Sequence, residues 1–312
     1  RGAGAIISLF NFNGGTLRPG IANTNFMANL TGGVSRANVR NGGAIIDTSG
    51  FSIMIGQALE HSNIGGDAEV DGGLTKNGAG ALTLTNANSY NGPTAVNAGT
   101  LWLNGSLSTG ALNVAGVASL GGSGSISGAV SLASGSLLQP GAAPATLGTL
   151  RVGGALALGG NGTARVDIVG GTLDKVIVNG AVTPSGVTMV ELVGSPGSLP
   201  SGEYPIIEAA GGLNGGVTNF WTAASLTRSV LYQLAYDTTS PVQRLLLSVT
   251  AGGTPSNLVW NGNGSQWDVA TSLNWSNGVS SDVFYHYDAV TFGAAGIAQS
   301  NVDLVANVFP SS

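Results

Sequence analysis

The residues of this chain that could carry acid–base or metal chemistry are few, and most of them gather in one short segment. Glu60, Asp67, Glu69 and Asp71 form an acidic cluster, and His61 lies beside the first of them. Clustered carboxylates cleave glycosidic bonds or bind calcium, so a sugar-cleaving pair and a weak calcium site are two interpretations. The spacing lacks the alternating oxygen ligands of a calcium-binding loop. We therefore favour a third interpretation, a solvated loop.

Other catalytic arrangements have little support in the sequence. His61 and His286 are the two histidines, and the chain has no cysteine. A proton-transfer pair of His61 with Glu60 can be drawn, but no Gly-x-Ser-x-Gly nucleophile turn accompanies it. Cysteine nucleophiles and cysteine-ligated zinc are excluded by composition. We predict no catalytic residue, no cofactor and no metal, and hence no enzymatic activity.

Aromatic residues concentrate near the end of the chain, and they form the candidate contact site. Exposed aromatic rings bind sugar faces, whereas buried ones pack the joints between modules. The sequence leaves both interpretations open, a glycan contact and a module junction, and we favour the junction. The residues are Trp260, Trp267, Trp275, Tyr285 and Tyr287.

The composition predicts many short strands joined by tight turns. Glycine makes up 52 of the 312 residues, 43% of residues are hydrophobic and only 8% are charged, against ~25% charged in average globular chains. Residues 77–150 contain no charged side chain and no histidine. The net charge of −5 and the scattered basic residues argue against nucleic acid as a partner. No apolar run is long enough for a transmembrane helix.

A Gly-x-apolar-x-apolar element recurs at residues 99–103, 110–114, 128–132 and 148–152. The spacings and the alternation predict a right-handed parallel β-helix, with about 12–15 coils at ~20 residues per coil. Residues 54–61 could also form two helical turns, although the preceding FSIMI favours a strand. The alternating positions expected to point inward are Leu101, Leu103, Leu112, Val114, Val130, Leu132, Leu150 and Val152.

The segment GGLTKNGAGALTLTNANSYNGPTAVNAGTL, residues 72–101, resembles the autotransporter-associated β-strand repeat of secreted bacterial surface proteins. Residues 164–252 resemble, more loosely, the end region of autotransporter passengers that closes the β-helix and assists its folding. Residues 253–292 resemble the opening of another module of such proteins. The resemblance implies a passenger-type β-helix that is secreted or lies on the bacterial cell surface.

These patterns predict four parts. We expect β-helix coils with longer loops over residues 1–71 and repeat coils over 72–163. A longer-stranded end region over 164–252 and the start of a following module over 253–312 complete the chain. We expect both ends to lie within a longer object.

The expected function is structural: a stalk or fibre that assembles end to end into filaments. The expected partners are further copies or covalent neighbouring modules, and surface glycans. One alternative is a carbohydrate-binding adhesin that uses the aromatic C-terminal segment. A second is a polysaccharide-degrading β-helix enzyme, which the uncharged stretch argues against.

Overall fold

The chain folds almost entirely into short β-strands. The computed structural model describes residues 7–28, 34–194, 199–223, 227–294, 296, 301–308 and 310. Within them lie 35 strands and one short 3-10 helix, η2 (Val217–Asn219). No helix in these residues is long and apolar enough to span a membrane.

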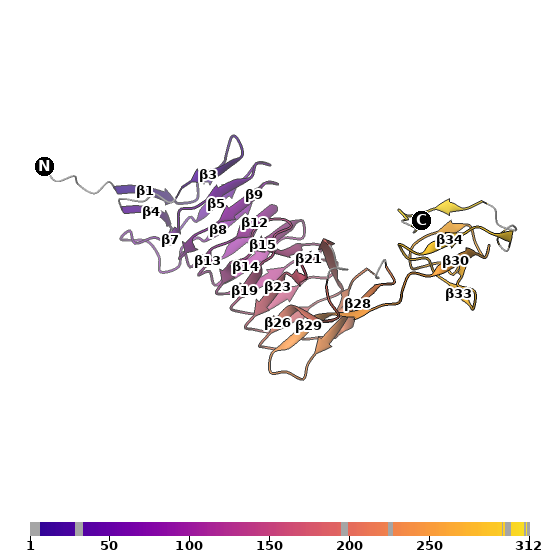
Figure 1. Ribbon diagram of the computed structural model, residues 1–312. Coiled ribbons are helices and arrows are strands. Elements are labelled where there is room, and N and C mark those ends of the chain that lie inside the picture. The colour runs from indigo at the N-terminus through magenta and orange to yellow at the C-terminus, as the bar shows by residue number, and fades with distance from the viewer. Residues whose placement is uncertain are drawn as a thin grey trace. The chain divides into compact units, whose positions relative to one another are not determined.

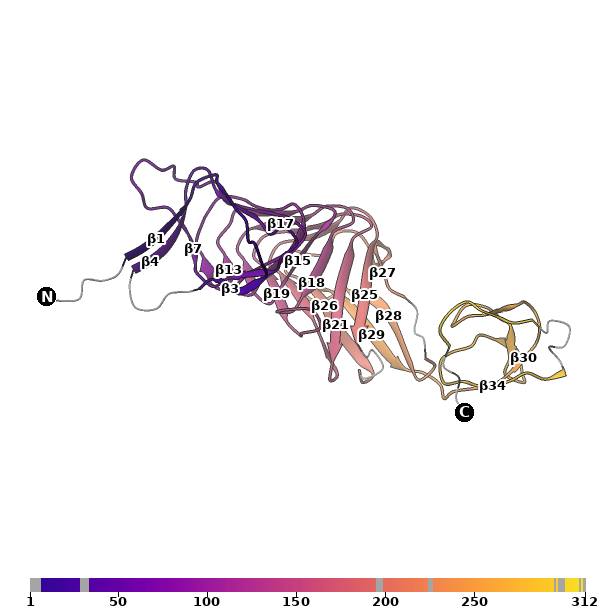
Figure 2. The same cartoon turned by 90° about the horizontal axis from the view of Figure 1, so that it is seen from above.

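Most strands stack into three faces of a parallel β-helix (Figures 1 and 2). The first face begins with β1 (Ile7–Phe12), β4 (Val34–Val39) and β7 (Leu59–His61). It continues in an eight-stranded sheet of β10 (Ala87–Asn88), β13 (Ser106–Leu107), β16 (Ser125–Ile126), β19 (Thr149–Val152), β23 (Lys175–Val178), β26 (Gly202–Ala209), β29 (Gln243–Ala251) and β28 (Val230–Asp237).

The second face is an eight-stranded sheet of β2 (Thr16–Leu17), β5 (Ala44–Asp47), β8 (Leu74–Asn77), β11 (Thr94–Val96), β14 (Ala111–Val114), β17 (Ala129–Leu132), β20 (Leu156–Leu158) and β24 (Val182–Pro184). The third face consists of β3 (Asn23–Met27), β6 (Ile53–Ile55), β9 (Ala81–Leu84), β12 (Gly99–Leu103), β15 (Ala118–Gly122), β18 (Leu137–Pro140), β21 (Thr163–Val169), β25 (Thr188–Gly194) and β27 (Phe220–Trp221). A short strand, β22 (Thr172–Leu173), pairs antiparallel with the end of β21.

Each coil visits the three faces in turn, which confirms the predicted parallel β-helix. Eight coils have a strand on every face, and β26 and β27 belong to a ninth that contacts the second face through a bridge between Val182 and Leu213. This count is below the predicted 12–15 for two reasons. Coil length varies, since Ile53 pairs with Leu82 but Leu82 pairs with Leu101. In addition, the strands between residues 257 and 304 form separate sheets and add no coil.

The interior is a column of small and branched apolar side chains. All eight residues predicted to point inward are buried, with at most 4% of their surface exposed. Residues 53–55 and 59–61 are strands, which agrees with the favoured interpretation of that segment.

The four recurring glycine elements, however, do not mark one position of successive coils. They lie on all three faces, in β12, β14, β17 and β19. Only the second and third are stacked, with Ala111 opposite Ala129. Glycine followed by in–out alternation occurs at corners of all three faces, so spacing alone does not distinguish one face from another.

The chain divides into two compact units. The coil unit comprises residues 1–194, 205–222 and 234–246, and the C-terminal unit comprises 195–204, 223–233 and 247–312. The C-terminal unit contains a sheet of β33 (Ser281–Asp282), β32 (Trp275–Ser276), β30 (Asn257–Trp260) and β34 (Ala289–Thr291). It also contains the pair β31 (Gln266–Trp267) and β35 (Asp303–Leu304). The predicted division at residues 71, 163 and 252 stays a prediction.

Candidate functional site

The acidic cluster lies where the chain leaves β7 and loops toward β8, and its members have structural partners. The guanidinium of Arg40 donates two hydrogen bonds of 2.9 Å to Asp67. These bonds are the main reason that the pKa of Asp67 falls to about 2. Arg36 lies 3.0 Å from Glu60, whereas Glu69 is exposed. The carboxylates are therefore distributed among separate contacts.

Asp71 contradicts the expectation that this cluster is solvated, because it is only 4% exposed. Its carboxylate accepts hydrogen bonds of 2.9 Å from the backbone amides of Gly73, Asn91 and Gly92. The same carboxylate lies 2.9 Å from Nδ1 of His61, so the histidine pairs with Asp71 and not with Glu60. This carboxylate joins the loop to the turn before β11 in the next coil.

Lys76 is the unexpected feature of the neighbouring strand, because its side chain points into the β-helix. The strand register places Lys76 between Ile46 and Val96, and all three residues are fully buried. Its ammonium donates to the carbonyl oxygens of Gly78 at 2.7 Å, Ala98 at 2.8 Å and Asn77 at 3.0 Å, and to Oγ1 of Thr48 at 3.1 Å. Burial lowers the pKa of Lys76 to about 8, and Asp47 acts in the opposite direction.

The four oxygens around Lys76 belong to the same corner of three successive coils. Thr48 follows β5, Asn77 ends β8 and Gly78 follows it, and Ala98 follows β11. The ammonium is the side-chain donor to the buried carbonyls of Gly78 and Ala98, whereas the carbonyl of Asn77 also accepts a 2.9 Å hydrogen bond from the amide of Thr48. We call Lys76 a cross-coil clip, meaning a buried polar side chain that forms hydrogen bonds with neighbouring coils.

Asn88 is a second cross-coil clip, on another face of the β-helix. It is 1% exposed, and its Oδ1 accepts a 3.0 Å hydrogen bond from the amide of Leu59 in the preceding coil. Its Nδ2 donates to the carbonyl of Ser106 in the following coil at 3.1 Å, and to that of Asn86 at 2.8 Å. Asn88 thus connects three coils where the strands are only two or three residues long.

Substitution of Asn88 by Leu is expected to lower the free energy of unfolding by about 1–3 kcal/mol, because the buried amide of Leu59 loses its acceptor. Chemical denaturation of both proteins measures the difference. Asn113→Leu is the matched control, since Asn113 is exposed on the outer side of β14. Equal effects of the two substitutions would contradict a clip at position 88.

The turn that follows Asn88 contains a further buried polar contact. The hydroxyl groups of Tyr90 and Thr94, both fully buried, lie 2.7 Å apart. Gly99, at the next corner, has a φ of +65° and packs against the carbonyl of Gly80, where a Cβ atom would clash. Residues 74–103 therefore combine buried polar contacts with a corner that only glycine fits.

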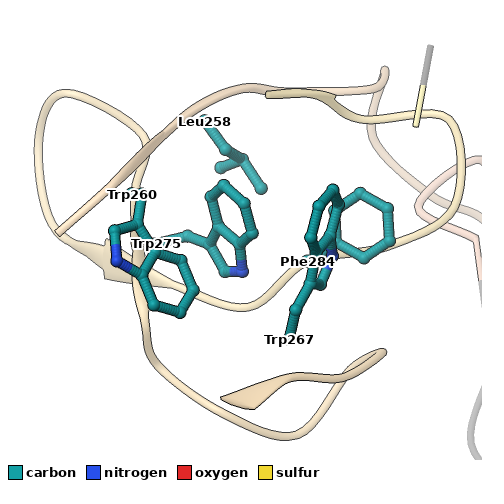
Figure 3. Packing of buried hydrophobic residues seen from close by; sticks show 5 residues of the cluster. All are labelled: Leu258, Trp260, Trp267, Trp275 and Phe284. Atoms are coloured by element: carbon teal, nitrogen blue, oxygen red, sulfur yellow. The ribbon is translucent and has the colours of Figure 1, made fainter. Parts of the chain in front are cut away.

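The three tryptophans of the predicted aromatic site are buried, whereas a sugar contact requires exposed rings. Trp260, Trp267 and Trp275 are 1%, 8% and 1% exposed, and they pack with Phe284 and Leu258 (Figure 3). Ring centroids of Trp275 lie 5.0 Å from Trp260 and 5.1 Å from Trp267. These indoles form the core of the C-terminal unit itself, so they present no face to a glycan.

The two tyrosines of the predicted site lie outside this core. Tyr287 is 58% exposed. Tyr285 is half-buried, with the guanidinium of Arg228 4.8 Å from its ring centroid. Arg228 also donates to both oxygens of the fully buried Asp288 at 2.9 Å. Of the five predicted residues, Tyr287 is therefore the one that offers most of its ring to solvent.

The chemistry of these groups is that of packing and hydrogen bonding. Within the described residues, no group of three or more His, Asp or Glu side chains could hold a metal ion. The buried polar residues Lys76 and Asn88 were not predicted as a site, and Asp71 was considered only as a member of the acidic cluster. The signal that could have revealed Lys76 is its place in the in–out alternation, two residues after Leu74.

The segment that contains both clips is similar to a known repeat. Residues 74–103 match the family model of the passenger-associated transport repeat. Over 189 residues, the chain is 32% identical to the adhesin BmaC autotransporter of Brucella suis biovar 1 (strain 1330). That alignment covers 58% of the chain and 5% of the relative, so the chain spans a small fraction of its length.

Proposed function

Because the chain carries a repeat of autotransporter passengers, we propose that it is a surface or secreted structural segment of adhesin type, a stalk built from stacked coils. The observation that carries this proposal is the parallel pairing of strands from one coil to the next. Leu82, Leu101 and Leu120 stack in three successive strands, and the same pattern runs through the other faces. Such a ladder of main-chain hydrogen bonds around a dry core lets each coil support the next.

The finer proposal is that stalks join end to end. Leu9 and Phe10 on β1 are 54% and 43% exposed, so the first coil offers apolar surface beside strand backbone. A further coil, from a second copy or from a covalently linked module, would cover both.

Electron microscopy and sedimentation velocity over a range of concentrations test this assembly. We expect filaments that a denaturing gel resolves into single chains. The double substitution Leu9→Ser and Phe10→Ser should shorten the filaments. Val117→Ser is the control, because Val117 is 85% exposed on a turn inside the stack. A chain that sediments as a monomer at every concentration would rule out self-assembly and leave a stalk held in place by covalent neighbours.

A second candidate function is glycan binding by the C-terminal unit. The supporting observation is the exposed ring of Tyr287, together with Phe292, which is 53% exposed. A glycan array of the intact chain and its Tyr287→Ala variant tests this function. Binding that is lost in the variant supports a glycan contact, whereas an array without binding rejects it. No arrangement of carboxylates in the described residues supports the enzymatic alternative.

A further inference from the structure

Two buried carboxyl groups of the coil unit lie outside every contact described above. Asp167 is on the outer side of β21 and is 4% exposed, and Asp174 follows β22 and is fully buried. The hairpin of β21 and β22 brings them together, and the amide of Asp167 donates to Oδ2 of Asp174 at 3.1 Å. The two side chains therefore share one buried site.

The pair holds a surface loop in place. Oδ1 of Asp174 accepts a 2.6 Å hydrogen bond from the amide of Gly148. Residues 141–148 connect β18 to β19 and contain no charged side chain. Asp174 thus fastens the end of this loop to the hairpin, beside Asp167.

The negative charge of the pair is incompletely balanced. Oδ1 of Asp167 has no hydrogen-bond partner among the described residues. The cationic side chains of the adjoining strands are engaged elsewhere: Arg165 bonds to Glu191 at 2.9 Å, and Lys175 lies 3.6 Å from Glu208. Arg151 of β19 is exposed. A bare, buried carboxylate oxygen beside a second carboxylate is costly unless something neutralises it.

We propose that Asp167 and Asp174 form a proton-binding site, in which Asp167 takes up one proton beside the ionised Asp174 and thereby secures the loop of residues 141–148. A proton fits better than a divalent cation, because both oxygens of Asp174 already accept amide hydrogens. One bare oxygen remains, whereas calcium takes about 6–8 oxygen ligands. The proton sits on Oδ1 of Asp167, and the carboxylate of Asp174 keeps both of its amide donors.

The direction of the pH effect follows from the buried setting. Burial is the main cause that raises the pKa of Asp174 to about 6, and burial also raises the pKa of Asp167. Below the pKa of the unfolded carboxyl, 3.8, the contribution to stability is complete. It is lost as the pH rises through the raised pKa of the folded site, because the folded chain must release a proton that the unfolded chain has already released.

The test compares the intact chain with its Asp167→Asn variant between pH 5 and pH 7.5. We expect the urea midpoint of the wild type to fall over this range. The variant, which mimics the protonated acid, should show a smaller fall and a higher midpoint than the wild type at pH 7.5. Hydrogen exchange, corrected for its intrinsic pH dependence, should show faster opening of residues 141–149 at pH 7.5 in the wild type only. Glu203→Gln is the control, because Glu203 is exposed.

Three results would overturn the proposal. One is an Asp167→Asn variant whose pH dependence matches that of the wild type and of the Glu203→Gln control. The second is a wild type that 1 mM CaCl₂ stabilises at pH 7.5 as much as acidification does, with reversal by EDTA, because a cation would then balance the pair. Carbon-detected NMR titration of the Asp side chains supplies a direct readout. The third result is that both carboxyls titrate at their ordinary pKa, which would reject a bound proton at this site.

Discussion

Replacement of Lys76 by Met is expected to lower the free energy of unfolding of the coil unit by about 2–4 kcal/mol. Methionine keeps the length and apolar stem of the side chain, so the change isolates the ammonium group. Without it, the carbonyls of Gly78 and Ala98, at 2.7 Å and 2.8 Å, lose their donor inside the β-helix. Chemical denaturation measures the loss, and hydrogen exchange should show it at the corners of coils two, three and four.

The matched control for this prediction is Lys175→Met. Lys175 also lies in a strand of the coil unit, but its ammonium is partly exposed and 3.6 Å from Glu208. Exposed ion pairs contribute ~0–1 kcal/mol, so this variant should unfold much like the wild type. If the two Lys→Met substitutions lower the free energy of unfolding equally, the hydrogen bonds of Lys76 make no special contribution to stability.

The advantage of Lys76 over Met should also depend on pH. Burial lowers the pKa of the folded amine to about 8, from 10.5. Between these values the unfolded chain binds more protons at this position than the folded chain, so the contribution of Lys76 to stability rises with pH. We expect the difference between wild type and Lys76→Met to widen from pH 7.5 to pH 9.5. A difference that narrows would show that the four oxygens favour the ammonium more than burial disfavours it.

Substitution of Trp275 by Ala is expected to destabilise the C-terminal unit by about 3–5 kcal/mol, the usual cost of removing a fully buried indole. Trp275 is 1% exposed and contacts the rings of Trp260, Trp267, Phe284 and Phe292. The loss should be local, because this aromatic core is separate from the apolar column of the coils. Hydrogen exchange resolves the two units: residues 257–291 should lose protection, while residues 74–132 keep theirs.

Trp221→Ala provides the comparison for this second prediction. Trp221 ends the third face of the coil unit and is 55% exposed, so its removal leaves little cavity. Loss of protection throughout the coils of the Trp275→Ala variant would contradict an independent core. Because this variant disturbs folding, loss of glycan binding in it would be uninformative, and Tyr287→Ala is the variant that addresses binding.

The fold was predictable because a β-helix repeats one simple rule. Glycine at a corner followed by alternating apolar residues identified the interior, and Leu101, Leu112 and Val130 are buried as expected. The number of coils was not predictable from the same rule. Strands are fixed by stacking, whereas the length of each turn depends on local contacts such as the loop that Asp71 fastens.

The candidate sites were harder to predict, because burial decides what a polar or aromatic residue does. Trp267 and Trp275 pack against each other, but a string of letters does not distinguish an exposed ring from a core ring. Lys76 was overlooked, because a lysine is usually assigned to the surface. Its role depends on Thr48 and Ala98, which are 28 and 22 residues away along the chain.

The unequal length of the coils has an evolutionary consequence. Residues 62–73 and residues 141–148 are excursions between strands, and the faces on either side of them keep their parallel register. New sequence can therefore be inserted at a corner without changing the positions of the strands above and below. Changes in length at these corners should therefore be tolerated more readily than changes at the clips and the inward-facing leucines that hold the scaffold.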